Sequence, residues 1–166
     1  MHFEKKFVGV ENNEVYMTLE SWVNRHTENT DDLVLQMDIE GDEYDVLMNV
    51  PMATLKKFRI LVIEFHALQS LSDPFGFRII NFTFRKLLED FVIVHIHPNN
   101  VFKPVKVGSF MVPPIMEYTF LRKDRFRHLE LTTKFPHELD QTNIQGKPDF
   151  DLPSCWYASQ KSLNGK

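Results

Sequence analysis

The stretch Asp32-Leu-Val-Leu-Gln-Met-Asp-Ile-Glu-Gly-Asp-Glu-Tyr-Asp-Val-Leu47 joins an apolar run to a cluster of carboxylates across one glycine. Its apolar part, from Leu33 to Met37, has the short continuous pattern of a strand that is covered on both faces. Gly41 allows the chain to turn, and the acidic residues after it suit the start of a helix. The stretch therefore predicts strand, turn and helix. Asp38 then stands at the carboxyl end of the strand, the edge at which open α/β sheets bind ligands.

The carboxylates of this stretch are not equivalent. Asp42, Glu43 and Asp45 fit ordinary positions at a helix start and on a solvated helix face. Asp38 differs because it closes an apolar strand, where an unpaired ionised carboxylate is costly to bury. We therefore expect Asp38 to bind a backbone group, a cation or a ligand.

Composition limits the class of protein. The chain has 166 residues, of which 43% are apolar and 25% charged, as in a soluble globular protein of one domain. A net charge of -4 gives no electrostatic case for nucleic acid, and no apolar run is long enough to cross a membrane. The single cysteine, Cys155, excludes an internal disulfide and fits a reducing compartment, so we expect a cytoplasmic location. The six glycines do not cluster, so no glycine-rich phosphate-binding loop is present.

Strand and helix patterns alternate along the rest of the chain, which favours an α/β fold: a three-layer sandwich with a mostly parallel sheet and a late antiparallel strand. Phe82, Leu87 and Leu88 are expected to face inward from a helix over 79–90. Residues 1–124 are expected to form the domain, and 125–166 an irregular carboxyl-terminal tail. The other expected elements are a strand over 15–17, a helix that Thr18 caps, strands over 59–66 and 91–97, a turn at 73–76, and an edge or hairpin strand over 116–122.

Polar residues end two of these strands. If neighbouring strands start at the same level, Asp38, Glu64 and His66 meet above the carboxyl edge of the sheet, with His95, His97 and Asn99 one strand further along. The first three suit proton abstraction, with His66 or Asp38 as the base. They equally suit a divalent cation held by carboxylate oxygens and one imidazole. The residues alone leave both interpretations open. For the two later histidines a structural role is favoured, one hydrogen-bonded and the other facing a helix.

Several motifs together resemble the carboxyl-terminal half of the FkbM-type methyltransferases, a family that uses S-adenosylmethionine. The resemblance covers roughly Val15 to Asp124, and Asp-Ile-Glu-Gly-Asp-Glu is its most specific element. It implies the last four strands of a class I, Rossmann-like methyltransferase fold and methylation of a sugar, glycan or polyketide hydroxyl. Related cation-dependent enzymes place a metal-binding aspartate where Asp38 stands. The matching segments are Thr18-Leu-Glu-Ser-Trp22, Leu35-Gln-Met-Asp-Ile-Glu-Gly-Asp-Glu43 with Leu47, Ile63-Glu-Phe-His66, His95-Ile-His-Pro-Asn-Asn100 and Glu117-Tyr-Thr-Phe-Leu-Arg122.

The resemblance also assigns roles. Catalysis falls to Asp38, Glu64 and His66, and cofactor binding to Asp38, Glu40 and Gly41. The glycine-bearing loop that holds the cofactor in this fold has no counterpart here. The chain is therefore expected to be either the catalytic half of an O-methyltransferase whose amino-terminal half is missing, or a non-catalytic interaction or regulatory subunit. In both cases we expect the half-sheet to need a partner, either that missing half or a second copy. A metal- or sugar-binding module is a third and weaker interpretation.

Overall fold

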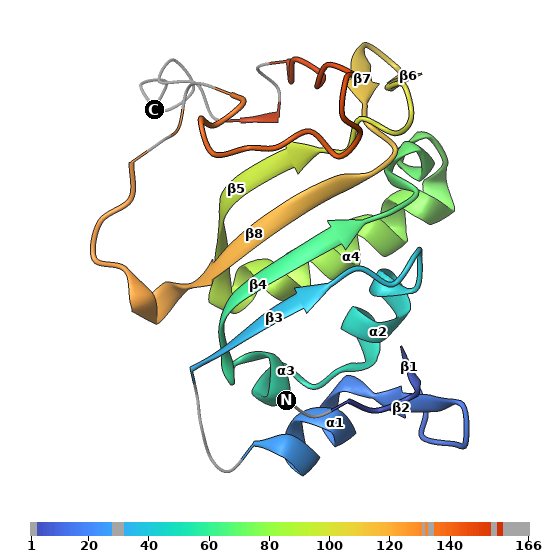
Figure 1. Cartoon of the computed structure of the whole chain (residues 1–166), viewed down its shortest axis with the longest axis vertical. Helices are drawn as coiled ribbons and strands as arrows, with labels where there is room; N and C mark the ends of the chain where they lie inside the picture. Colours follow the sequence, from blue (N-terminus) through green and yellow to red (C-terminus); the bar gives the residue numbers. More distant parts are fainter. Residues whose placement is uncertain (1–2, 28–31, 131, 133–134, 154–155, 158–166) are drawn as a thin grey trace.

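The computed structural model describes residues 3–27, 32–130, 132, 135–153 and 156–157. Its main sheet has four strands in the order β3-β4-β8-β5 (Figure 1). β3 pairs with β4 in parallel, and β8 is antiparallel to both of its neighbours, β4 and β5. Three strands thus point the same way, which brings their carboxyl ends to one edge. The bounds are β3 Leu33–Met37, β4 Phe58–Phe65, β8 Met116–Arg122 and β5 Phe91–Pro98.

The sheet confirms the α/β fold but corrects three expectations. β8 was expected at an edge or in a hairpin, yet it lies between β4 and β5, because its alternate side chains Met116, Tyr118 and Phe120 are buried in the core. Two of the three neighbouring strand pairs are therefore antiparallel, so the sheet is mixed rather than mostly parallel. A full three-layer sandwich is not evident either, since Val34 on the face opposite the core is 53% exposed.

The connection from β3 to β4 contains α2 (Glu43–Asn49) and α3 (Met52–Leu55), and β4 is followed by η1 (Leu68–Ser72) and α4 (Pro74–Asp90). The long helix α4 runs behind the sheet (Figure 1). Lys86 on α4 holds α2 in place, because its Nζ donates to the carbonyl oxygens of Leu47, Met48 and Val50 at 2.8, 2.9 and 2.6 Å. A cation at a helix carboxyl end also suits the helix dipole. Burial lowers the pKa of Lys86 from its usual range.

α4 begins earlier than the sequence indicated. The predicted turn at 73–76 is its first turn, where Asp73 Oδ1 accepts hydrogen bonds from the backbone N–H groups of Phe75 and Gly76, both at 2.9 Å. The helix buries Gly76, Ile80, Thr83 and Leu87, a stripe with helical spacing. Leu87 is therefore inward as predicted, whereas Phe82 and Leu88 lie off this stripe and are exposed, contrary to the prediction.

The two ends of the described chain pack against this sheet. β1 (Phe7–Gly9) and β2 (Tyr16–Thr18) form a small parallel pair, and α1 (Leu19–His26) follows with Thr18 as its cap, as predicted. β6 (Val105–Val107) and β7 (Phe110–Val112) form a hairpin in a region that was expected to be a loop. η2 (Lys123–Arg125) is the last helix or strand assigned in the described part of the chain, and the irregular tail over 125–166 stays a prediction. The division of the chain at residue 124 stays a prediction.

None of the helices in the described part of the chain is long and apolar enough to cross a membrane.

Candidate functional site at the carboxyl ends of β3 and β4

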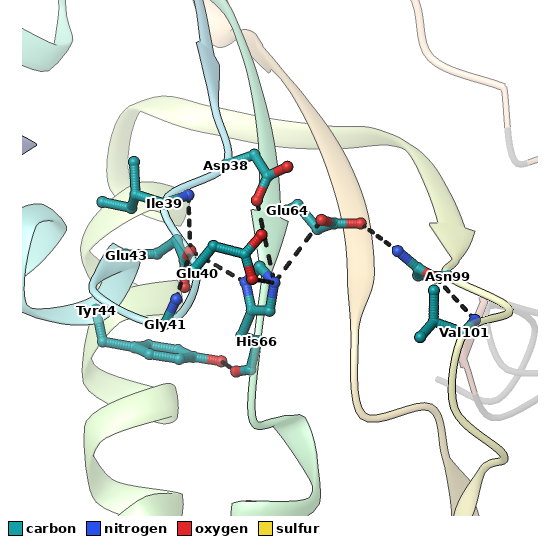
Figure 2. Close-up of polar contacts among 10 residues, drawn as sticks. All are labelled: Asp38, Ile39, Glu40, Gly41, Glu43, Tyr44, Glu64, His66, Asn99 and Val101. Carbon is teal, nitrogen blue, oxygen red and sulfur yellow. Dashed lines mark hydrogen bonds and ion pairs between the residues drawn. The ribbon is translucent and has the colours of Figure 1, made fainter. Parts of the chain in front are cut away.

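The three residues predicted to converge do so. Asp38 follows β3, Glu64 lies near the end of the neighbouring β4, and His66 comes directly after β4 (Figure 2). His66 Nε2 is 4.0 Å from Asp38 Oδ1 and 3.8 Å from Glu64 Oε2. Glu40 joins them from the β3–α2 loop, with Oε2 at 3.5 Å from the same nitrogen. The imidazole thus faces three carboxylates, all beyond normal hydrogen-bond distance.

We call the edge formed by Asp38, Glu40, Glu64 and His66 the rim. Glu43 lies below this rim and orients the imidazole of His66. Its Oε1 lies 3.1 Å from His66 Nδ1 and accepts the backbone N–H groups of Ile39 and Gly41 at 3.2 and 3.0 Å. Because Oε1 already accepts two backbone N–H groups, it is an acceptor towards the imidazole too, so Nδ1 is the donor and Nε2 is directed at the open rim. The side chain of Glu43 is fully buried, which corrects the expectation that it lies on a solvated helix face. The signal that could have identified it is the Asp-Ile-Glu-Gly-Asp-Glu element, which Glu43 completes.

The backbone beside the site is strained. In the described chain the non-glycine residues with positive φ are Glu40, at 58°, and Ala67, at 56°. One carries a rim carboxylate and the other follows His66 directly. Left-handed conformations are unfavourable for residues with a Cβ and gather at functional sites. Gly41, with φ of 116°, needs its glycine for the turn itself.

Asn99 completes the far side of the rim. Its Nδ2 donates to Glu64 Oε1 at 2.8 Å, and its Oδ1 accepts the N–H of Val101 at 2.9 Å (Figure 2). It reaches Glu64 across β8, at the edge where the sequence placed it. Burial raises the pKa of Glu64, and the charge of Asp38 adds to this, against the opposing effects of Asn99 and His66.

A cleft of about 270 Å³ runs along β3 as far as Asp38 and Ile39. Its lining includes Trp22 of α1, and its charged residues are Asp38, Glu4 and Lys6. Mostly apolar walls with charged groups of both signs suit a ligand that has an apolar ring and charged groups.

Of the second pair of histidines, His97 is hydrogen-bonded as expected, whereas His95 contacts a carboxylate of the tail instead of facing a helix. His95 Nε2 lies 2.9 Å from Asp140 Oδ1, and His97 Nε2 lies 3.2 Å from Asp149 Oδ2. Both carboxylates belong to the tail, so neither imidazole is directed at a helix and neither joins the rim. Cys155, which the sequence suggested is a simple packed or exposed thiol, lies outside the described residues.

A family model of the methyltransferase FkbM domain matches residues 3–97, which is more than half of the chain. No curated protein and no solved structure matches the chain significantly. The matched region contains the three rim residues that the sequence predicted, together with Glu43. Asn99 and the tail follow it. On this match, the chain belongs to the FkbM methyltransferase domain family.

Proposed function

We propose that the chain takes part in O-methylation, with S-adenosylmethionine as methyl donor and a hydroxyl of a sugar, glycan or polyketide-like small molecule as acceptor. The observation that carries the proposal is the buried Glu43–His66 pair, which directs Nε2 at an open rim. A carboxylate that fixes the tautomer and orientation of an imidazole is the arrangement by which proteins position a general base.

The cleft along β3 fits such a methyl donor in character, since it offers apolar walls and the carboxylate of Asp38. S-adenosylmethionine, when bound, supplies a methyl group from a positively charged sulfonium. We assign Asp38 and Glu40 to that positive charge. Gly41 gives its N–H to Glu43 and so shapes the turn that carries them. These three cofactor-binding roles are proposals.

His66 acts on the acceptor in this mechanism. The acceptor hydroxyl would donate a hydrogen bond to His66 Nε2 and lose its proton to that nitrogen. The methyl group would pass from the sulfonium to the hydroxyl oxygen, and the broken carbon–sulfur bond would leave a neutral thioether. The imidazolium that results is stabilised by Asp38, Glu40 and Glu64, whose oxygens already lie 3.5 to 4.0 Å away. Glu64, held by Asn99, also positions the hydroxyl.

A divalent cation on the same rim is the second arrangement that a specific observation favours. One oxygen each of Asp38 and Glu64 and one nitrogen of His66 lie within 4.8 Å of one another, a spacing into which a cation fits after small side-chain adjustments. Glu43 would then be the outer carboxylate that orients a metal-bound histidine. The acceptor oxygen would bind the cation, which would lower the pKa of its hydroxyl so that the proton passes to a water molecule instead of to His66.

The rival function is a non-catalytic interaction subunit. Two features support it: the outer edge of β3, which pairs with no strand in the described sheet, and the partly open sheet face. Both suit a second copy or a further protein segment. Binding of the methyl donor separates this rival from the enzyme.

The first experiment is titration calorimetry of the chain with S-adenosylmethionine and S-adenosylhomocysteine, with and without Mg²⁺. We expect saturable binding. Asp38→Ala should abolish this binding, and the control Asp42→Ala should leave it unchanged. Where transfer to a carbohydrate acceptor is then detected with labelled cofactor, His66→Asn should lower kcat by roughly 10² to 10⁴-fold. Loss of transfer in EDTA with recovery in Mg²⁺ would assign the cation arrangement. A folded chain that binds neither compound would contradict the enzyme and leave the interaction subunit.

A further inference from the structure

One segment of the tail, residues 144–149, binds the part of the chain that supplies Asn99 to the rim. The segment turns at Gly146, whose φ is 78°, and the N–H of Lys147 donates to the carbonyl oxygen of Ile144 at 3.3 Å. A positive φ of this size favours glycine. The tail crosses the carboxyl end of β5 and the connection to β6 (Figure 1).

Asn100 lies at the centre of this contact. Its side chain is fully buried, its Oδ1 accepts the N–H of Ile144 at 2.9 Å, and its Nδ2 donates to the carbonyl oxygen of Lys147 at 2.8 Å. One amide group thus joins both ends of the turn. Because a buried amide without partners is costly, the turn and Asn100 stabilise each other.

Two further contacts fix the chain on either side of this amide. His97 Nε2 lies 3.2 Å from Asp149 Oδ2, and Lys147 Nζ donates to the carbonyl oxygen of Val101 at 2.7 Å. Segment 144–149 therefore holds the end of β5 and the start of the connection that follows it.

Asn99 links this contact to the rim. Its Nδ2 donates to Glu64 Oε1 at 2.8 Å, and its Oδ1 accepts the N–H of Val101 at 2.9 Å (Figure 2). Val101 is thus bound by Asn99 through its N–H and by Lys147 through its carbonyl oxygen. A displacement of Lys147 or of Asn100 would move the backbone that positions Asn99.

We propose that segment 144–149 is a positioning element of the candidate site, which holds Asn99 against Glu64 and so fixes the Glu64 carboxylate at the rim. The family match ends at residue 97, so the segment and Asn99 lie outside the matched domain. The consequence for methyl transfer rests on the proposed function. The coupling between the tail and the rim does not, and it is measured without a methyl donor.

The test is NMR of the full chain, with the side-chain amide signals of Asn99 and the hydrogen exchange of the Val101 N–H as reporters. Gly146→Val strains the turn from the tail side alone, since a Cβ there meets nothing within 4 Å while the positive φ disfavours a branched residue. Ile144→Pro independently removes the N–H that Asn100 accepts. Both variants should shift the Asn99 signals. Exchange at Val101 should quicken roughly tenfold relative to the amides of β4, as the loss of one or two hydrogen bonds implies.

The matched control is Gly108→Val at the turn between β6 and β7, a glycine that also has positive φ, at 60°, and open space around its Cβ. It should leave both reporters unchanged. Unchanged reporters in both tail variants would overturn the proposal, because Asn99 would then be held without the tail. An equal change in the control would overturn it too. Coupling in a chain that transfers no methyl group would support the proposal and count only against the proposed function.

Discussion

At the carboxyl ends of both β4 and β5 a histidine contacts a carboxylate, but the two histidines do so through different ring nitrogens. At β4, His66 contacts the fully buried Glu43 through Nδ1, and its Nε2 faces an open rim. At β5, His97 contacts Asp149 of the tail through Nε2, the nitrogen that His66 keeps free of close contacts. The two contacts therefore differ in which ring nitrogen they use. The contact at β4 leaves Nε2 of His66 available for the proposed chemistry, and the contact at β5 joins the tail to the sheet.

The largest expected difference between the two histidines is their tautomer, that is, which ring nitrogen carries the proton. In the neutral form of each ring, His66 should carry its proton on Nδ1 and His97 on Nε2, because each carboxylate partner accepts. Long-range ¹⁵N–¹H correlation spectra distinguish the two forms. Asp149→Asn should disturb only the His97 signals. Finding His66 protonated on Nε2 would remove the basis for its role as a base.

The largest energetic effect is expected at Glu43. Glu43→Ala leaves the N–H groups of Ile39 and Gly41 and the Nδ1–H of His66 without their acceptor in a partly buried place. We expect the free energy of unfolding to fall by about 3 kcal/mol, measured by urea denaturation. Glu43→Gln, which keeps an acceptor oxygen, should lose less than half of that. Similar losses in the two variants would mean that volume rather than hydrogen bonding matters at this position.

The matching experiment at β5 is Asn100→Ala. This side chain is fully buried and joins the sheet to the tail, since its Oδ1 accepts the N–H of Ile144 at 2.9 Å and its Nδ2 donates to the carbonyl oxygen of Lys147 at 2.8 Å. Its loss should cost about 2 kcal/mol in unfolding free energy and speed proteolysis of the tail. The exposed Asn143→Ala should change neither. Unchanged proteolysis in Asn100→Ala would show that other contacts hold the tail.

The same comparison explains what could be predicted from the sequence. The rim around His66 is built from residues close to two strand ends, so a strand pattern followed by polar residues was enough to bring Asp38, Glu64 and His66 together. Glu43 was missed because its burial depends on how α2 packs, which Lys86 determines from α4. An acidic residue at a helix start looks the same in sequence whether it faces water or the core.

The parts that could not be predicted depend on contacts distant in sequence. Asp149 meets His97 from 52 positions away, in a segment without periodicity. The insertion of β8 between β4 and β5 likewise follows from burial of its alternate residues, not from chain order. The exposure of Phe82 was mispredicted because the buried stripe of α4 begins at Gly76, which the sequence indicated as a turn.

The smallest expected effect is a pH dependence of stability caused by Glu64, which distinguishes the carboxyl end of β4 from that of β5. Burial raises the pKa of Glu64 in the folded chain, so the folded state binds its proton more tightly than the unfolded state. The contribution of Glu64 to stability is then fully present below its unfolded pKa and is lost as pH rises through the raised folded value.

Glu64→Gln keeps an acceptor for Asn99 and removes this loss. Thermal unfolding in EDTA should therefore show Glu64→Gln more stable than the unchanged chain by about 0.5 kcal/mol at neutral pH, allowing for solvent screening. The gain should vanish near pH 4, whereas the exposed Glu14→Gln should show no such trend. A loss of stability at neutral pH would mean that the charge of Glu64 is already compensated by His66, and the rim would then be a closed ion-pair network like the tail contacts at β5 rather than an open site.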